Sequence, residues 1–383
     1  MQEQFEYVAT CLFGLEHFVG EEIDALGYQR ISTIDGRVTF RGDISAIARC
    51  NLWLRTAERI FIKMGEFRAD SFSALFDGVY ALPWERWIGK DDAFPVTGHA
   101  IRSQLTSIPD CQSIVKKAVV ERLKAEYGIE WFQEEGTPYR IEFFLLDNMA
   151  TLMIDTTGTA LHKRGYRPAA GTAPLRETLA AAMVKIARPR EEVLLWDPFC
   201  GSGTIPLEAA LLMTNTAPGL NRRFIAEEFY DVPPHLFEEA REEARSLIRF
   251  DTAFEAYASD IDPHMVQIAQ ENIARAGMDK YVKAFCRDAL TIETMGRRGT
   301  IVCNPPYGER MMDASAVKQL YRQMGEAFAA LGRWQIYVIT SDEEFERSYG
   351  RRADKVRRLY NGMIRCNYYQ FFKTKVSSHG ADI

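Results

Sequence analysis

Four consecutive residues in the last third of the chain, Asn304, Pro305, Pro306 and Tyr307, can hold a flat ring that carries an amino group. The Asn304 side-chain oxygen and the Pro305 carbonyl can each accept one N–H of that group. The two prolines restrict the backbone, so these acceptors need little reordering before they bind. Tyr307 can stack on a base, a contact worth about 1–3 kcal/mol. We therefore expect these four residues to be catalytic, although a proline-rich turn after a strand would look the same.

A second stretch reads DPFCGSGT over residues 197–204, after an apolar run at 193–196 and before a helix-like run at 205–213. This is the strand, tight turn and helix that open a doubly wound α/β sheet, in which ligands bind at the carboxyl ends of the strands. Glycine lets the backbone turn sharply and lets a ligand approach without a Cβ in the way. A GxG turn alone is also found in nucleotide-binding and purely structural loops.

Three acids end three successive expected strands: Asp197, Asp260 and Asp288. A carboxylate in the position of Asp260 can accept both hydroxyls of a ribose. Asp262 precedes Pro263 and is expected to cap the next helix. Asp197 could equally be a helix cap. Each acid alone has a structural explanation, but three in these positions together favour a ligand site.

The elements around these motifs alternate after residue 193, with strands at 255–260, 282–288, 300–303 and 334–341 and helices at 263–276 and 316–331. This alternation predicts a parallel sheet covered by helices. Residues 215–250 interrupt it with a detour that includes an acidic amphipathic helix. The last two strands, around Asn361-Gly362, predict a terminal hairpin.

The N-terminal half predicts smaller α+β domains. Residues 1–43 contain a strand, a helix and a hairpin around Asp35-Gly36, too little to bury a core alone, so we expect this piece to pack on the next segment of the chain. Residues 44–157 contain a helix, a long strand, an amphipathic helix at 111–128 and two strands around Asp147-Asn148. Residues 158–175 form a link that is rich in glycine and proline.

Composition excludes several classes of protein. Among 383 residues no apolar run reaches the roughly 18 that a membrane span needs, and no signal-peptide pattern is present. Seven scattered cysteines without a CxxC pair and six histidines without ligand spacing indicate neither a metal nor disulfides, so we expect a cytoplasmic protein. A net charge of −6 argues against wholesale coating of nucleic acid. Basic clusters at 116–124, 163–167 and 347–358 remain candidate binding faces or ordinary solvated surface.

The DPFCGSGT turn with NPPY downstream closely resembles the S-adenosylmethionine loop of amino-group methyltransferases. The order of elements over 44–157, with RSQLTSIPDCQSIVKKAV at its centre, resembles the THUMP domain, an RNA-binding module of RNA-modifying enzymes. Residues 1–43 resemble its ferredoxin-like companion. APGLNRRF, at 217–224, resembles the THUMP-containing 23S ribosomal RNA guanine-N2 methyltransferases and related transfer-RNA enzymes.

This resemblance implies a Rossmann-like class I methyltransferase domain over 158–383, preceded by a ferredoxin-like domain over 1–43 and a THUMP domain over 44–157. It implies S-adenosylmethionine as cofactor, with Asp197 and the glycines at its methionine end, Asp260 on its ribose and Asp288 on its adenine amino group. The segment HKRGYR at 162–167, continuing to APL at 173–175, would close over the cofactor. The implied cofactor-binding residues are Asp197, Phe199, Gly201, Gly203, Thr204, Asp260, Ile261, Asp288, Ala289 and Asn304.

The expected activity is formation of N2-methylguanosine in RNA, with 23S ribosomal RNA as the first candidate and transfer RNA as a close alternative. NPPY also serves adenine-N6 methylation of DNA, but the THUMP-like half argues against that substrate. A non-catalytic RNA-binding assembly factor is the alternative from another class. Cys303 lies inside a strand, so we interpret it as a packing residue rather than a nucleophile for carbon methylation.

Overall fold

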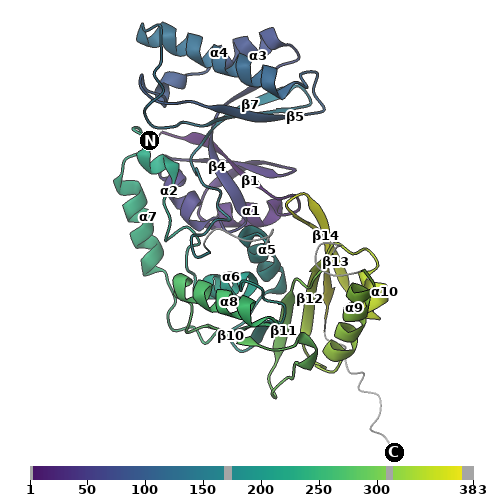
Figure 1. Cartoon of the computed structure of the whole chain (residues 1–383). Helices are drawn as coiled ribbons and strands as arrows, with labels where there is room; N and C mark the ends of the chain where they lie inside the picture. The colour runs from purple at the N-terminus through teal and green to yellow at the C-terminus, as the bar shows by residue number, and fades with distance from the viewer. Residues whose placement is uncertain (1–2, 168–174, 308–313, 373–383) are drawn as a thin grey trace, which may run out of the picture. The chain divides into compact units, whose positions relative to one another are not determined.

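The computed structural model describes residues 3–167, 175–307 and 314–372, and its chain divides into two compact units (Figure 1). The first unit takes in the chain up to Cys11, then Glu16–Leu161 and Gly219–Glu243. The second takes in Leu12–Leu15, His162–Pro218 and the chain from Ala244 onward. Within the described ranges, no helix has the length and apolar character to cross a membrane.

The first unit is built on one mixed sheet whose described strands lie in the order β2-β3-β1-β4-β7-β6-β5. These strands are β1 (Phe5–Cys11), β2 (Gln29–Ile34), β3 (Arg37–Gly42), β4 (Ala57–Arg68), β5 (Val96–Ile101), β6 (Ile141–Leu146) and β7 (Met149–Asp155). The first part of the long strand β4 pairs with β1 and its second part with β7. The short N-terminal piece therefore completes its core by joining the sheet of the following segment, as its length predicts.

Helices cover this sheet, and α3 and α4 lie side by side over its β5–β7 part (Figure 1). They are α1 (Glu16–Ala25), α2 (Ser45–Trp53), α3 (Phe72–Tyr80), a short 3₁₀ helix at Trp84–Arg86 and α4 (Ile108–Tyr127). The amphipathic helix predicted at 111–128 is confirmed as α4. It begins a few residues earlier than predicted, with Pro109 in its first turn, and ends at Gly128 in the left-handed conformation.

Residues 219–243 pack with the first unit, although they lie in sequence between strands of the second. Gly219 donates its N–H to the Leu52 carbonyl at 2.9 Å, and a Cβ there would come within 2.8 Å of the Leu52 Cα. The Phe229 ring stacks on Tyr139 at 4.1 Å. The predicted domain 158–383 included this detour, which contains a 3₁₀ helix (Ile225–Glu228) and most of α7 (His235–Ser246). Residues 219–243 pack with the first unit because aromatic side chains among them are buried there.

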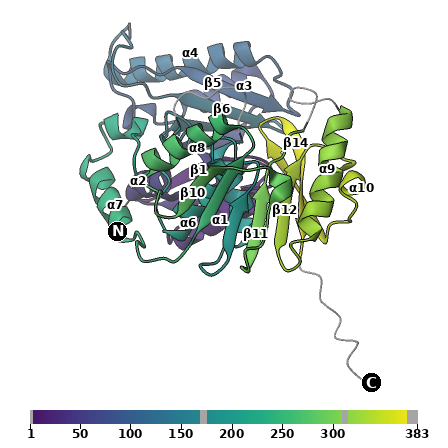
Figure 2. The same cartoon turned by 60° about the horizontal axis from the view of Figure 1, so that its bottom comes forward.

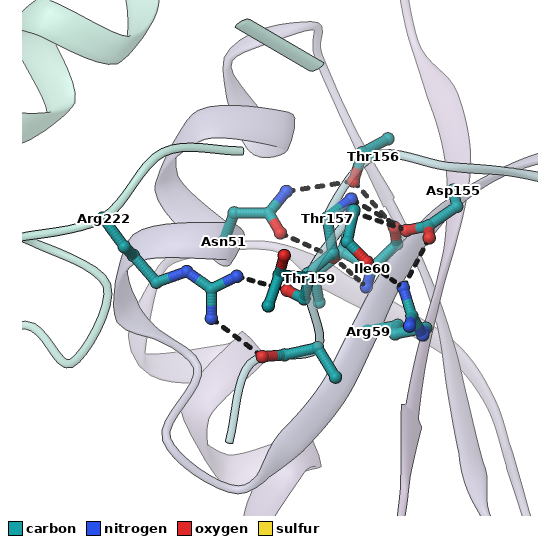
Figure 3. Close-up of polar contacts among 10 residues, drawn as sticks. Asn51, Arg59, Ile60, Asp155, Thr156, Thr157, Thr159 and Arg222 are labelled. Atoms are coloured by element: carbon teal, nitrogen blue, oxygen red, sulfur yellow. Dashed lines mark hydrogen bonds and ion pairs between the residues drawn. The ribbon is translucent and has the colours of Figure 1, made fainter. Parts of the chain in front are cut away.

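A buried polar network holds the chain where it leaves β7 (Figure 3). The Asn51 amide donates to the Thr156 hydroxyl at 2.9 Å and accepts from the Thr157 hydroxyl at 2.7 Å. The Ile60 N–H in turn donates to the Thr157 hydroxyl at 2.9 Å. Asn51 thus ties α2 to the residues that follow β7, and each buried polar group of this set has a partner.

Charged groups extend the same network on both sides (Figure 3). Arg59 on β4 contacts the buried carboxylate of Asp155 at 2.5 Å. Arg222, from the detour, donates to the carbonyls of Thr159 and Ala160. The segment after β7 is therefore fixed by β4, α2 and the detour at once.

The second unit is a parallel sheet with an antiparallel end, in the described order β10-β9-β8-β11-β12-β14-β13. Its strands are β8 (Leu194–Asp197), β9 (Ala256–Asp260), β10 (Val282–Cys286), β11 (Gly299–Cys303), β12 (Gln335–Thr340), β13 (Lys355–Asn361) and β14 (Ile364–Phe371). Strands β8 to β12 are parallel, and β14 pairs antiparallel with β12. The predicted Rossmann-like α/β class and its terminal hairpin are confirmed.

The helices of the second unit are α5 (Glu177–Ala187), α6 (Thr204–Met213), α8 (Pro263–Ala276), a 3₁₀ helix at Ala289–Thr291, α9 (Ala314–Ala329) and α10 (Phe345–Tyr349). Figure 2 shows α9 and α10 together beside β12 and β14. The core centres on Trp196, whose ring meets those of Tyr257, Phe285 and Trp334. All of β8 is buried, as expected for a central parallel strand.

The network around Asn51 makes a stability prediction. Asn51→Ala leaves the Thr157 hydroxyl without its acceptor and Thr156 without a donor, so we expect the free energy of unfolding to fall by about 1–3 kcal/mol. The measurement is urea denaturation followed by circular dichroism. Gln133→Ala, at an exposed position, is the control and should leave the unfolding curve unchanged. Equal curves for both variants would contradict a stabilising role for the network.

Candidate active site

The loop after β8 has a shape that two glycines allow. Gly201 and Gly203 take φ angles of 49° and 82°, in the left-handed region that favours glycine. A Cβ at Gly203 would lie 3.2 Å from the Ala269 Cβ on α8. The Cys200 N–H donates to the Ser259 carbonyl at 3.0 Å, which fixes the loop to the end of β9. The loop therefore presents its backbone at the carboxyl edge of the sheet with little side chain in front of it.

Asn272 on α8 supports this loop and was not predicted. Its side-chain amide donates to the Ser202 carbonyl at 3.0 Å, and the residue is fully buried. Val266, Ala269 and Ile273 form the buried face of the same helix. The sequence signal for this role is a polar residue on the apolar face of the helix. Because a buried amide needs hydrogen-bond partners, such a residue indicates a contact with a neighbouring loop.

Asp197 at the end of β8 is almost completely buried, with 1% of its surface exposed. Its carboxylate accepts the Phe199 N–H at 3.0 Å, which shapes the turn. Burial raises the pKa of this carboxyl well above its ordinary value, and the nearby charge of Asp260 acts in the same direction. This geometry supports the alternative role for Asp197, which is to hold the turn.

Asp260 at the end of β9 has both carboxylate oxygens engaged by backbone amides. Oδ2 accepts from Gly201 at 3.0 Å and Oδ1 from Asp262 at 3.1 Å. Each oxygen keeps a second lone pair, so the partly exposed carboxylate can still accept two donors, the number that a ribose diol offers. Asp262 itself caps α8 by accepting the His264 N–H at 2.9 Å, with Pro263 next to it, as predicted. Ile261 between them is largely exposed.

Asp288 follows β10 and accepts the Leu290 N–H at 2.9 Å, so that it caps the short helix at Ala289–Thr291. Ala289 is buried. Because β8, β9 and β10 are parallel neighbours, the structure brings all three predicted acids to one edge of the sheet.

The loop after β11 continues that edge. The Pro306 carbonyl is already occupied by the Tyr321 hydroxyl at 3.1 Å, which leaves the Asn304 side chain and the Pro305 carbonyl as the acceptors we propose. Among the residues that the structure describes, no group donates to the buried Oδ1 of Asn304. A buried acceptor without a donor is costly, so this atom fits an amino group that a substrate supplies.

Tyr307 and Cys303 flank these acceptors in different surroundings. The Tyr307 hydroxyl accepts from the Asn361 amide at 3.3 Å, and burial raises the pKa of Tyr307 to about 12. Cys303 is fully buried within β11, and burial raises the pKa of its thiol well above its ordinary value. A thiol in that state is a poor nucleophile, which agrees with the packing role expected for Cys303.

The segment before residue 168 reaches the glycine loop through Arg167. Its guanidinium lies 2.7 Å from the Glu177 carboxylate and 3.3 Å from the Thr204 hydroxyl. The Ser202 hydroxyl is also within reach of Arg167 at 3.4 Å. Residues 168–174, part of the segment expected to close over the cofactor, lie outside the described residues.

Two of the three basic clusters are largely committed to other contacts. Arg164 is buried and pairs with the equally buried Glu208, which also accepts the Tyr166 hydroxyl at 3.0 Å. On α4, Lys116 contacts Glu134 at 2.5 Å, and Arg122 pairs with Glu85. Arg164 therefore belongs neither to a binding face nor to solvated surface, the two alternatives left open for 163–167, because its charge is paired inside the core. The residues at 347–358 remain mostly exposed.

A sheet in this order, with a glycine loop after β8 and acids after β8, β9 and β10, defines the second unit as a class I methyltransferase domain. Family profiles agree along the chain. The RMKL-like methyltransferase domain matches residues 164–370, the RlmL ferredoxin-like domain residues 6–61 and the THUMP domain residues 69–155. In the described residues, no cluster of His, Cys, Asp or Glu could hold a metal ion.

Curated relatives extend the match to nearly the whole chain. YpsC of Bacillus subtilis (strain 168), named as a candidate RNA methyltransferase, is 44% identical over 97% of this chain and 96% of its own. The ribosomal RNA large subunit methyltransferase K/L of Shewanella frigidimarina is 30% identical over 95% of this chain. This chain spans about half of that relative, 52% of its length.

Two solved structures are similar throughout. SMU.472, a candidate methyltransferase in complex with SAH, is 41% identical with a TM-score of 0.91 over 98% of this chain and all of its own. A protein from Listeria monocytogenes, named as a predicted N6-adenine-specific DNA methylase, is 43% identical with a TM-score of 0.92 over 97% of each chain. The chain thus belongs to the RMKL-like methyltransferase family, with THUMP and ferredoxin-like domains, and S-adenosylmethionine is its cofactor.

The residues at the sheet edge fit this cofactor. The loop after β8 has no side chain at positions 201 and 203, and Asp260 has two lone pairs for a ribose. The roles of Asp197, Phe199, Thr204, Asp288 and the other predicted contacts stay predictions.

Asp260 and Asp262 form a matched pair for testing the cofactor site. Asp260→Ala removes the acceptor proposed for the ribose, and we expect S-adenosylmethionine binding to weaken by about 1–3 kcal/mol in isothermal titration calorimetry. Asp262→Ala removes only a helix cap, so it should cost about 1 kcal/mol of stability and leave cofactor affinity unchanged. Equal affinities for Asp260→Ala and the native chain would exclude Asp260 from the site.

Proposed function

We propose that the protein methylates the N2 amino group of a guanine in RNA, and that its substrate is 23S ribosomal RNA in the cytoplasm. The observation that carries this proposal is the loop after β11. It combines a buried, unpartnered Asn304 oxygen, among the described residues, with stiff backbone and the Tyr307 ring. Such a loop suits a planar base with an exocyclic amine, because it offers acceptors where that amine offers two N–H donors.

The chemistry demands orientation more than proton removal. When bound, S-adenosylmethionine supplies a methyl group on a positively charged sulfur. The lone pair of an exocyclic amine is delocalised into its ring, so Asn304 and the Pro305 carbonyl each accept an N–H and direct the nitrogen. The amine proton becomes acidic only as the N–CH₃ bond forms and positive charge develops on nitrogen. The acceptors therefore matter most in the transition state.

RNA is favoured as substrate by the first unit. A THUMP match over 69–155 and the RNA-directed names of YpsC and the K/L enzyme support it. The name of the Listeria protein points instead to adenine-N6 in DNA, a reaction that the same loop could serve. The THUMP match argues against DNA as the substrate. Transfer RNA is the closer alternative, and fractionated RNA substrates distinguish it from 23S ribosomal RNA.

Asn304 and Cys303 test the reaction type. We expect Asn304→Ala to lower kcat for transfer of labelled methyl to RNA by about 10²–10³-fold, by analogy with loss of one oxyanion-hole donor, with cofactor affinity nearly unchanged. Cys303→Ser, one residue earlier, should keep most activity because amine methylation needs no covalent adduct.

The opposite pattern, with Cys303→Ser inactive and Asn304→Ala active, would indicate carbon methylation through a cysteine adduct. If the native chain transfers no methyl group to RNA or DNA, the alternative of a non-catalytic RNA-binding assembly factor is favoured instead.

A further inference from the structure

The tip of the β13–β14 hairpin lies against the proposed base-binding loop. Asn361 pairs with Ile364, so the turn consists of Gly362 and Met363, one residue later than the Asn361-Gly362 turn predicted from sequence. Gly362 takes a φ of 63°, as a two-residue hairpin turn requires at its first central position. The Asn361 amide donates to the Tyr307 hydroxyl, and the Cys366 thiol lies 3.9 Å from the same oxygen. The turn residues therefore come directly after Asn361, which contacts the proposed base-binding loop.

The two faces of the hairpin differ in character. Directly paired residues of antiparallel strands share a face, and so do residues two apart on one strand. Asn361 and Cys366 consequently lie on the face toward Tyr307, together with the half-exposed Ile364. Tyr360 pairs with Arg365, so these two residues lie on the opposite face.

That opposite face is basic and aromatic. Arg358 and Arg365 are exposed on either side of Tyr360. In the described part of the chain, Arg358 has no carboxylate partner, and Arg365 meets Glu343 only at 3.9 Å, with both side chains mostly in solvent. The Phe13 ring, from the loop Leu12–Leu15, packs edge-on against Tyr360 at 5.8 Å and is itself half exposed.

Met363 at the turn is the most exposed large apolar side chain of the described residues, with 99% of its surface in solvent. A single exposed apolar side chain is ordinary on a protein surface. Met363 matters here because of its place, in the turn between Asn361, which contacts Tyr307, and the basic face that carries Arg358 and Arg365. Met side chains inserted between nucleic-acid bases are a known form of contact, and aromatic residues beside cations suit an unpaired strand.

We propose that the hairpin tip, residues 358–365, binds the unpaired RNA strand next to the target base. Met363 contacts the base that neighbours the target base. Arg358 and Arg365 contact phosphates of the same strand, and Tyr360 offers a surface on which a base can stack. The inference rests on the proposed function, because it places this strand beside a base held by Asn304 and Tyr307. Charge complementarity favours RNA over an apolar protein partner on this face.

The test compares hairpin variants with controls of the same residue types at the other edge of the sheet. The hairpin variants are Met363→Ala and the double variant Arg358→Ala with Arg365→Ala. The controls are Met295→Ala and the double variant Arg190→Ala with Arg333→Ala, all exposed and located before the amino ends of β11, β8 and β12. Each full-length protein is assayed for kcat/KM with RNA from a deletion strain, for RNA affinity by anisotropy across a salt series and for S-adenosylmethionine affinity.

We expect Met363→Ala to lower kcat/KM for RNA roughly tenfold, the size of one lost base contact. The double arginine variant should weaken RNA binding and flatten the slope of log affinity against log salt by about 1.4, for two lost phosphate contacts. Cofactor affinity and both controls should match the native chain.

Hairpin variants that match their controls in both turnover and salt dependence would overturn the inference. So would a parallel loss of cofactor affinity, because the hairpin would then act by supporting the Tyr307 loop. If the native chain methylates no RNA, the proposed function fails separately, and the salt series still reports whether the hairpin contacts RNA.

Discussion

The hydrogen bond from the Gly201 N–H to the Asp260 carboxylate joins the two loops that we propose hold the cofactor. Asp260, at the end of β9, thereby positions the loop that follows β8. Its carboxylate oxygens keep lone pairs that can accept from a ligand. The arrangement works only if β8 and β9 are neighbours in register, which the buried ring of Trp196 and its hydrogen bond to Ser259 secure. Packing of the central strands thus fixes the geometry of the site at their ends.

Elements packed on the same sheet also support the loop after β11, which we propose binds the base. The Tyr321 hydroxyl from α9 and the Asn361 amide from the terminal hairpin hold Pro306 and Tyr307 in place. The Asn304 oxygen, in contrast, finds no donor among the described residues. Tyr321 and Asn361 therefore satisfy the Pro306 carbonyl and the Tyr307 hydroxyl. The Asn304 oxygen stays available for the amino group that we propose it accepts. Preorganisation of this kind lowers the reordering needed in the transition state.

Much of this organisation could be predicted from the sequence, because it depends on local patterns. Strand–glycine–helix spacing identified the loop after β8, and the acids come together once their strands are parallel neighbours. Long-range contacts could not be predicted in the same way. Arg164, which is buried against Glu208, looked like part of a basic surface, and Asn272 looked like one polar residue in a helix. The detour at 219–243 packs with the first unit through contacts such as Arg222 with the Thr159 carbonyl, which no local pattern encodes.

We propose that this chain makes N2-methylguanosine in 23S ribosomal RNA. Nucleoside mass spectrometry of 23S, 16S and transfer-RNA fractions and of genomic DNA, from a deletion strain and from the same strain with the gene restored, tests it most directly. We expect N2-methylguanosine to fall in the 23S fraction on deletion and to return on restoration, with the other fractions unchanged. An unchanged 23S fraction, with loss of N6-methyladenine from DNA or of a modified nucleoside from transfer RNA, would contradict it.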